Sequence, residues 1–463
     1  MFLTRLKRSL IRPRTKLKLW LILAVCTSQA AFSEIDTGSL GESYKDLLDP
    51  LVQDGYLPAY YLAVGNKEGL LFERGMGTRG ALNHRDPSDS TPFALFSLSK
   101  PIVALAVLKI LDEKKINLDS PLSTYLTDFK QQNLLGKESV YHEIRLIDLF
   151  THSSGLANNL EFAGQISNNA FGSFVGGNEL SKKYQEQNLF TWESILTERT
   201  ELNSLSDEIE TLSSFPLLFE PGTEFQYSLS TDVLARLAEV LSGKTLNNFL
   251  RDALLSPLEM ENTVFVLDDN RRELRATVMK PLIRTFPVPG TYQRFEVLPF
   301  KNFGVEGIGD RANILSGGMG LISTGGDLVK FLRFLSSDMM LASGESYLTE
   351  EFKRFVYENQ LGDGLGANPL QGKLPRSSGD GFSALFNIRG FDRKYRSYFE
   401  RESIDFFYWS GFSSSVLWID PSSGIFGVFL SQIRPTQQYL INKLEEIVDK
   451  QFMWKASELE HAD

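Results

Sequence analysis

A dense apolar segment constrains the fold of this chain more than any other feature. This density, found within residues 98–112, is too high for a helix with one solvent-exposed face, and it predicts a helix buried on most sides. Such a helix needs a layered domain around it, which a 463-residue chain with 42% hydrophobic residues can supply. The apolar residues are Ile102, Val103, Leu105, Ala106, Leu108, Ile110 and Leu111.

Strand patterns occur at both ends of the chain. Two apolar runs within 60–77, on either side of Asn66-Lys67-Glu68-Gly69, predict a hairpin, and the last third carries short aromatic and β-branched runs with a turn at 420–424. We therefore expect an α/β fold in which both chain ends build one antiparallel sheet flanked by helices, with a mostly helical lobe inserted. The C-terminal strands are expected at 404–411, 414–420 and 424–432, and helices at 230–243, 327–337 and about 437–454.

No linker divides the chain into independent domains. We expect one unit over 31–463, with an α/β lobe at about 45–96 and 320–455 and a helical lobe at about 97–319. The helix at 230–243 ends at Gly243, a typical C-terminal stop. Its apolar face is expected to contain Val233, Leu234, Leu237, Val240 and Leu241.

The first 30 residues have the pattern of a secretory signal. Seven basic residues and no acidic residue precede the apolar run 19–26, and small residues follow it. We therefore expect cleavage after Ala30 and export to the periplasm or the medium. An uncleaved anchor is the alternative, but the run is shorter than the roughly 20 residues of a membrane span. Lipoprotein anchoring at Cys26, the only cysteine, is another alternative. Without this segment the chain is more acidic than its formal net charge of −10, which argues against nucleic acid partners.

Several familiar catalytic patterns are missing from the sequence. There is no Gly-x-Ser-x-Gly elbow, and His-Glu-Ile-Arg-Leu at 142–146 lacks the second histidine of a zinc motif. The glycine-rich stretch 317–326 lacks the lysine of a phosphate-binding loop. We therefore expect no metal and no cofactor.

Ser97 and Lys100 stand at the start of the apolar segment. Residues three apart share one face of a helix, so the lysine amine can approach the serine hydroxyl. Such a pair replaces a Ser-His-Asp triad if the amine is partly neutral, which burial favours. The alternative is a helix-cap serine with a surface lysine. Because Pro101 is tolerated only near a first turn, the helix must begin close to Ser97.

Two further segments add candidate groups. Tyr227 precedes the helix at 230–243, and its phenolate near a lysine is a candidate general base; the alternative is a tyrosine packed in the core. Trp409-Ser410-Gly411 lies in an expected edge strand. If this strand runs beside Ser97, the backbone N–H groups of Ser97 and Phe412 form an oxyanion hole; the alternative is an aromatic strand with a bend at small residues.

These three segments, in this order, resemble the penicillin-recognising serine hydrolases, which include class C β-lactamases, DD-peptidases and family VIII carboxylesterases. The resemblance covers about residues 45–450 and includes the stretches 117–126, 146–156, 315–332 and 417–432. It implies that Ser97 is the acylated nucleophile, that Lys100 and Tyr227 are its bases, and that Ser97 and Phe412 hold the oxyanion. His152, in the stretch Thr-His-Ser-Ser-Gly-Leu, is expected to be structural.

Two departures from the β-lactamase pattern concern the substrate. Leu229 stands where these enzymes have asparagine, and Trp409 stands where they have the lysine that pairs with the antibiotic carboxylate. With Ser410 and Gly411, these residues are the expected substrate contacts, and loops at about 157–200 and 361–381 are expected to wall the cleft. The pattern is most similar to a family VIII esterase that forms an acyl-enzyme with small neutral esters.

Other activities remain open at this stage. A β-lactamase or DD-peptidase is the alternative enzyme, and a non-catalytic binding protein on the same scaffold is the alternative from another class. We expect no stable membrane insertion after removal of the signal, and the sequence makes no prediction of the oligomeric state.

Overall fold

The computed structural model describes residues 37–80, 85–134, 140–156, 204–281, 295–297, 315–361, 381–390, 405–420 and 424–433. The expected signal segment, the loop at 157–200, most of the loop at 361–381 and the helix expected at 437–454 lie outside these residues.

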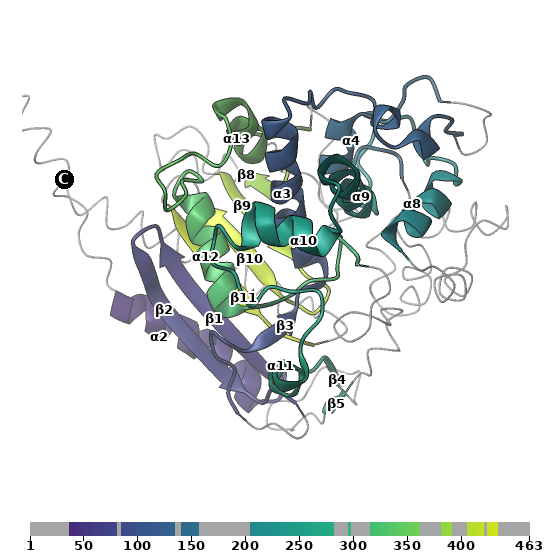
Figure 1. Ribbon diagram of the computed structural model, residues 1–463. Helices are drawn as coiled ribbons and strands as arrows, with labels where there is room; N and C mark the ends of the chain where they lie inside the picture. The colour runs from purple at the N-terminus through teal and green to yellow at the C-terminus, as the bar shows by residue number, and fades with distance from the viewer. Residues whose placement is uncertain are drawn as a thin grey trace, which may run out of the picture.

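A seven-stranded antiparallel sheet forms the centre of the fold (Figure 1). In its order, β2-β1-β11-β10-β9-β8-β7, the N-terminal hairpin β2-β1 joins the C-terminal strands, because β1 pairs with β11. The predicted sheet built from both chain ends is therefore confirmed. Its strands are β1 (Ala59–Asn66), β2 (Gly69–Gly77), β7 (Gly381–Phe382), β8 (Asn387–Gly390), β9 (Asp405–Ser410), β10 (Val416–Asp420) and β11 (Ile425–Leu430).

The predicted hairpin joins β1 to β2. The side chain of Asn66 accepts hydrogen bonds from the backbone N–H groups of Glu68 and Gly69, which closes the turn. Two short sheets lie apart from the main one. They pair β3 (Pro92–Ala94) with β6 (Ile322–Thr324), and β4 (Met279–Pro281) with β5 (Phe295–Val297).

β9 is an interior strand, so the expectation of an edge strand around Trp409 is wrong. Hydrogen bonds to β8 end at the pair Asn387–Tyr408, however, whereas those to β10 continue to the pair Ser410–Val416. Trp409 and Ser410 therefore extend past the end of β8. The sequence alone did not indicate β8 or β7, which are short and follow a glycine-rich, polar stretch.

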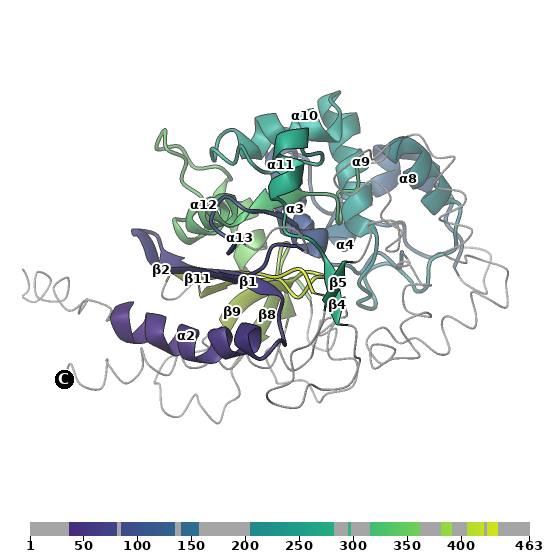
Figure 2. The same cartoon turned by 90° about the horizontal axis from the view of Figure 1, so that it is seen from below.

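Helices cover both faces of the sheet (Figure 2). α2 lies on one face, whereas α3, α9, α10, α12 and α13 lie on the other. None of the helices within the described ranges is both long enough and apolar enough to cross a membrane. The helices are α2 (Thr37–Gln53), α3 (Ser99–Glu113), α4 (Leu146–Phe150), α8 (Leu205–Ser213), α9 (Ser230–Ser242), α10 (Leu246–Leu250), α11 (Asp269–Leu274), α12 (Gly325–Ser336) and α13 (Glu350–Tyr357).

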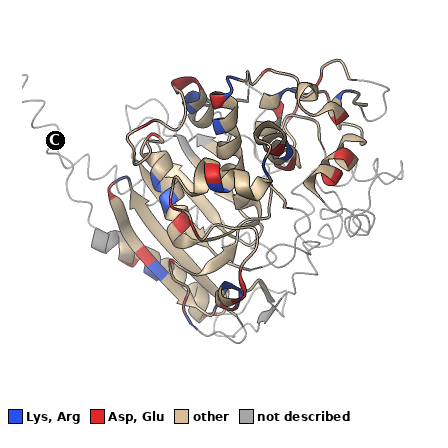
Figure 3. Cartoon of the chain, in the orientation of Figure 1, with Lys and Arg blue, Asp and Glu red and all other residues tan. Residues whose placement is uncertain are grey.

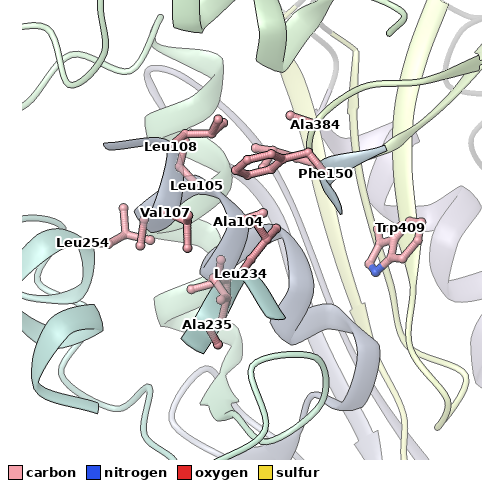
Figure 4. Packing of buried hydrophobic residues seen from close by; sticks show 14 of the residues in the cluster. Ala104, Leu105, Val107, Leu108, Phe150, Leu234, Ala235, Leu254, Ala384 and Trp409 are labelled. Atoms are coloured by element: carbon pink, nitrogen blue, oxygen red, sulfur yellow. The ribbon is translucent and has the colours of Figure 1, made fainter. Parts of the chain in front are cut away.

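α3 is the buried helix that the apolar density predicts, and it packs against α9. Figure 4 shows side chains of both helices in one cluster that continues toward Trp409 on the sheet. The buried face of α9 includes the small residues Ala235 and Ala238, and Val240 is 42% exposed. The expectation that Val240 faces the core is therefore wrong, because the close approach of α3 selects a face with small side chains.

Charged residues lie mainly on the helices and loops around the sheet, with acidic and basic positions interspersed (Figure 3). The strands between them are largely free of charge in this view. The polar side chains that are buried near the junction of α3, α9 and β9 are therefore exceptions, and they mark the candidate site.

Candidate active site

Ser97 lies in a one-turn 3₁₀ helix, η1 (Phe96–Leu98), between β3 and α3. Phe96, directly before it, has a φ of +49°, a left-handed conformation that is strained for a bulky residue and is often found at functional sites. Leu98 is the N-cap of α3 and no side chain caps the helix. The helix-cap interpretation of Ser97 is therefore wrong. Pro101 lies in the first turn of α3, where a missing N–H is tolerated.

The hydroxyl of Ser97 is paired with Tyr227. The two hydroxyl oxygens lie 2.7 Å apart, although the residues are 130 positions apart in sequence. Tyr227 lies in the loop that leads into α9, and its side chain is half-buried against the core. The structure thus brings together the serine and the tyrosine that the motifs identified separately.

Lys100 is buried, with 6% of its surface exposed, so the surface-lysine interpretation is wrong. Its Nζ donates a hydrogen bond to the backbone oxygen of Gly318 at 2.9 Å and lies 4.7 Å from the centre of the Tyr227 ring. Among the described residues, Lys100 is not hydrogen-bonded directly to Ser97, and Tyr227 lies beside both side chains. The ammonium is positioned to stabilise negative charge on the tyrosine.

Trp409 connects β9 to the nucleophile. Its indole Nε1 donates to the backbone oxygen of Ser97 at 2.7 Å, and its side chain is only 3% exposed. The indole therefore holds the peptide that follows Ser97, which fixes the direction of the adjacent backbone. Its role as a substrate contact stays a prediction, as does that of the half-buried Ser410.

Gly411 allows the end of β9 to approach η1. A Cβ atom at this position would lie 2.9 Å from the backbone oxygen of Leu95 and 3.2 Å from the Leu98 side chain. The next residue, Phe412, has its ring 5.5 Å from that of Phe96. Phe412 therefore lies beside the segment that carries Ser97, as the oxyanion-hole prediction requires, and that role stays a prediction.

Leu229 is the N-cap residue of α9, and its half-buried side chain packs against the main core cluster. Because it carries no polar group, it offers a ligand only an apolar contact. The role of Leu229 as a substrate contact stays a prediction.

His152 follows α4 and supports the loop that carries Tyr227. Its Nδ1 accepts a hydrogen bond from the backbone N–H of Ser228, and its backbone oxygen accepts one from Gln226. Its ring lies 4.9 Å from the Tyr227 ring. Burial, and to a smaller extent the charge of Lys100, lowers the pKa of His152 to about 3, so the imidazole is neutral at physiological pH.

Asp232 is a buried carboxylate that sequence reasoning missed. It lies in the first turn of α9, is 1% exposed, and accepts hydrogen bonds from the Ser316 hydroxyl and the Gly318 N–H. The only sequence signal is its position five residues after Tyr227, in a helix turn that otherwise carries small residues. Gly318, which accepts the Lys100 hydrogen bond, was noted only as part of a glycine-rich stretch.

No cluster of three or more His, Cys, Asp or Glu side chains suited to a metal ion occurs in the described parts of the chain. What the site does contain is a hydroxyl paired with a phenol, a buried ammonium beside that phenol, and a backbone fixed by an indole. These groups suit nucleophilic attack by a hydroxyl oxygen followed by proton transfer.

This chain is similar to known proteins over most of its length. The family model described as Beta-lactamase matches residues 45–451. Esterase EstB of Burkholderia gladioli is 28% identical over 250 residues, which are 54% of this chain and 57% of that esterase, so the match spans a little over half of it. Protein Rv1367c of Mycobacterium tuberculosis is 24% identical over 82% of this chain and 87% of its own length.

Solved structures share the fold. EstCE1, described as a hydrolase with promiscuous acyltransferase activity, has a TM-score of 0.64 at 19% identity, over 89% of this chain and 99% of its own. Simvastatin synthase LovD from Aspergillus terreus has a TM-score of 0.67 at 17% identity, over 89% and 97%. The match of the family model to most of the chain, together with the Ser97, Lys100 and Tyr227 motifs, shows that this chain belongs to the β-lactamase family of serine hydrolases.

Proposed function

We propose that this protein hydrolyses small neutral carboxylic esters through an acyl-enzyme on Ser97. The observation that carries the proposal is the 2.7 Å contact between the hydroxyl oxygens of Ser97 and Tyr227, beside the buried ammonium of Lys100. A serine hydroxyl is a weak nucleophile, and it requires an adjacent base to take its proton.

In the proposed reaction, the Ser97 oxygen attacks the ester carbonyl while Tyr227, as a phenolate stabilised by the Lys100 charge, takes the hydroxyl proton. The negative carbonyl oxygen is held by the N–H groups of Ser97 and Phe412. The bond to the alcohol oxygen then breaks, and the alcohol leaves with the proton from Tyr227. Water repeats the attack on the acyl-enzyme with the same base and releases the carboxylic acid.

The preference for neutral esters rests on the groups around the site. Leu229 and Trp409 occupy the positions where β-lactamases have asparagine and lysine, so neither supplies a polar group for the anionic antibiotic. Removing hydrogen-bonding groups from a site disfavours a ligand whose own polar groups would stay unpaired. The esterase name of EstB, which this chain matches over a little over half of its length, supports the same assignment.

The test compares purified protein on p-nitrophenyl butyrate and on a chromogenic cephalosporin, with Ser97→Ala as the control. We expect ester hydrolysis that the substitution abolishes and little cephalosporin hydrolysis. Strong cephalosporin hydrolysis with weak ester hydrolysis would instead favour the β-lactamase or DD-peptidase alternative. No turnover of either substrate by folded protein would favour a binding protein.

We also propose that the protein is exported. The basic and apolar pattern of the first 30 residues supports cleavage after Ala30. The mass of the protein purified from a secreting host should correspond to a chain that begins at Ala31. A chain that begins at Cys26 and carries lipid would support the lipoprotein alternative, and a full-length chain would support an uncleaved anchor.

A further inference from the structure

Gly318 connects Lys100 to a buried carboxylate that the proposed reaction does not yet use. Its backbone oxygen accepts the hydrogen bond of Lys100 at 2.9 Å, and its backbone N–H donates to Oδ1 of Asp232 at 3.3 Å. The hydroxyl of Ser316 donates to the same Oδ1 at 2.7 Å. Asp232 therefore fixes the segment 316–318 by two hydrogen bonds, and the same segment supplies the acceptor for Lys100.

The second carboxylate oxygen of Asp232 lies near the lysine ammonium. Oδ2 is buried and has no hydrogen-bond partner among the described residues. A Cβ atom at Gly318 would lie 2.6 Å from this oxygen and 3.1 Å from Nζ of Lys100. Because both distances start from one point, the two charged atoms lie less than about 6 Å apart, close enough for opposite charges to interact strongly in a buried site.

A buried carboxylate oxygen without a hydrogen bond is costly unless a positive charge compensates for it. Lys100 lies close enough to provide that charge. The glycines also allow the segment 316–318 to lie close to α9, because a Cβ atom at Gly317 would lie 2.6 Å from Ala235 and 3.0 Å from the Thr231 oxygen. Side chains at these positions would separate the segment from α9.

We propose that Asp232 is a positioning residue for Lys100. Through Gly318 it fixes the acceptor that orients the lysine ammonium, and its free oxygen places a negative charge beside that ammonium. Lys100 is thereby held over the ring of Tyr227. The inference rests on the proposed role of Ser97 as a nucleophile, but it does not depend on which acyl substrate the protein uses.

Other titratable groups also face Lys100. Tyr227 approaches it from the loop before α9, and the neutral ring of His152 lies 4.9 Å from the Tyr227 ring. A negative charge at Asp232 helps the neighbouring side chains to keep their protons. Replacing it with a neutral amide therefore makes proton loss from these side chains easier. The pH at which Ser97 becomes reactive should therefore fall.

Asp327 provides a matched control. It is a buried carboxylate at the corresponding position of another helix, the third residue of α12, as Asp232 is of α9. Its Oδ2 accepts hydrogen bonds from Asn262 and Thr263, and Lys330 lies 3.6 Å from Oδ1. If Asp232 only stabilised a helix end, Asp232→Asn and Asp327→Asn would both affect thermal unfolding, and neither would move the pH midpoint of Ser97 labelling.

The experiment measures the rate at which a fluorophosphonate labels Ser97 between pH 5 and pH 9, with thermal unfolding recorded for every variant. We expect Asp232→Asn to slow labelling at least about 10-fold at the wild-type optimum and to move the acidic midpoint down by on the order of one pH unit. Asp327→Asn should keep the wild-type midpoint even if it unfolds at a lower temperature.

A wild-type rate and midpoint in folded Asp232→Asn would overturn the inference. Absence of labelling in the wild-type protein would instead overturn the proposed nucleophile itself. If Asp232→Asn does not fold, Gly318→Ala replaces it, because its methyl group would separate the same two charges and Gly318 has no left-handed backbone that alanine would strain. This variant should label at least about 10-fold more slowly, and a wild-type rate would again overturn the inference.

Discussion

His152 gives the structure a pH-dependent stability that one substitution should remove. Its imidazole is buried among aromatic rings next to Tyr227, and its pKa of about 3 lies far below the 6.5 of a free histidine. Asparagine is the best replacement, because the backbone at 152 has a φ of +52°, which asparagine tolerates better than most residues. Its side-chain oxygen can also accept the hydrogen bond from Ser228 that Nδ1 accepts now.

The magnitude follows from the two pKa values. Between about pH 6.5 and pH 3 the unfolded chain binds a proton at His152 and the folded chain does not, so stability rises with pH and is lost as the pH falls. Each pH unit in this window corresponds to about 1.4 kcal/mol of unfolding free energy. From pH 7 to pH 4.5 the wild-type protein should therefore lose about 2.5 kcal/mol through this residue alone.

The assay is urea unfolding, followed by tryptophan fluorescence at several pH values from 7 to 4.5. His152→Asn leaves space where the ring packs, and this packing cost of roughly 2–4 kcal/mol is the same at every pH. The slope of stability against pH changes only because the titrating imidazole is gone. The variant should lose about 2.5 kcal/mol less than the wild-type protein over this range. His142→Asn, which changes an exposed histidine, serves as the control and should leave the wild-type slope. Equal slopes for His152→Asn and the wild-type protein would refute the assignment of a buried neutral imidazole.

The site itself makes two further predictions. Lys100→Ala and Tyr227→Phe should each lower kcat/KM for p-nitrophenyl butyrate at least about 10²-fold, as expected for positioned proton-transfer groups; rates near normal would remove them from the mechanism. Trp409→Phe deletes the donor to the backbone oxygen of Ser97. The free energy of unfolding, measured in urea, should therefore fall by about 1–3 kcal/mol, and kcat/KM should fall by about one order of magnitude. Unchanged stability and activity would show that this hydrogen bond does not position the nucleophile.

Local patterns in the sequence were sufficient for much of the fold. The apolar density of α3, the turn at Asn66 and the strands β9, β10 and β11 were predicted because neighbouring residues determine them. One sheet built from both chain ends was expected because strand patterns occurred near the two ends of the chain, and the pairing of β1 with β11 joins them. The short strands β7 and β8 carried no such pattern, and without them β9 looked like an edge strand.

The sequence predicted the parts of the candidate site whose residues lie close together in one motif. Ser97 and Lys100 lie three residues apart at a helix start, and together with the Tyr227 and Trp409 segments this spacing predicted an acyl-transfer site. Asp232 was missed because its role depends on Gly318, which lies 86 residues further along the chain. A carboxylate in the first turn of a helix has an ordinary explanation in the helix dipole, and only the packing of the two segments shows which charge lies beside it.

The central claim is that Ser97 is the nucleophile of a serine hydrolase, and covalent labelling tests it most directly. Wild-type protein and Ser97→Ala are treated with a fluorophosphonate, and intact mass followed by peptide mapping locates the adduct. We predict one adduct, on Ser97, in the wild-type protein and none in the variant. A folded wild-type protein that acquires no adduct, or that acquires it at another residue, would contradict the account.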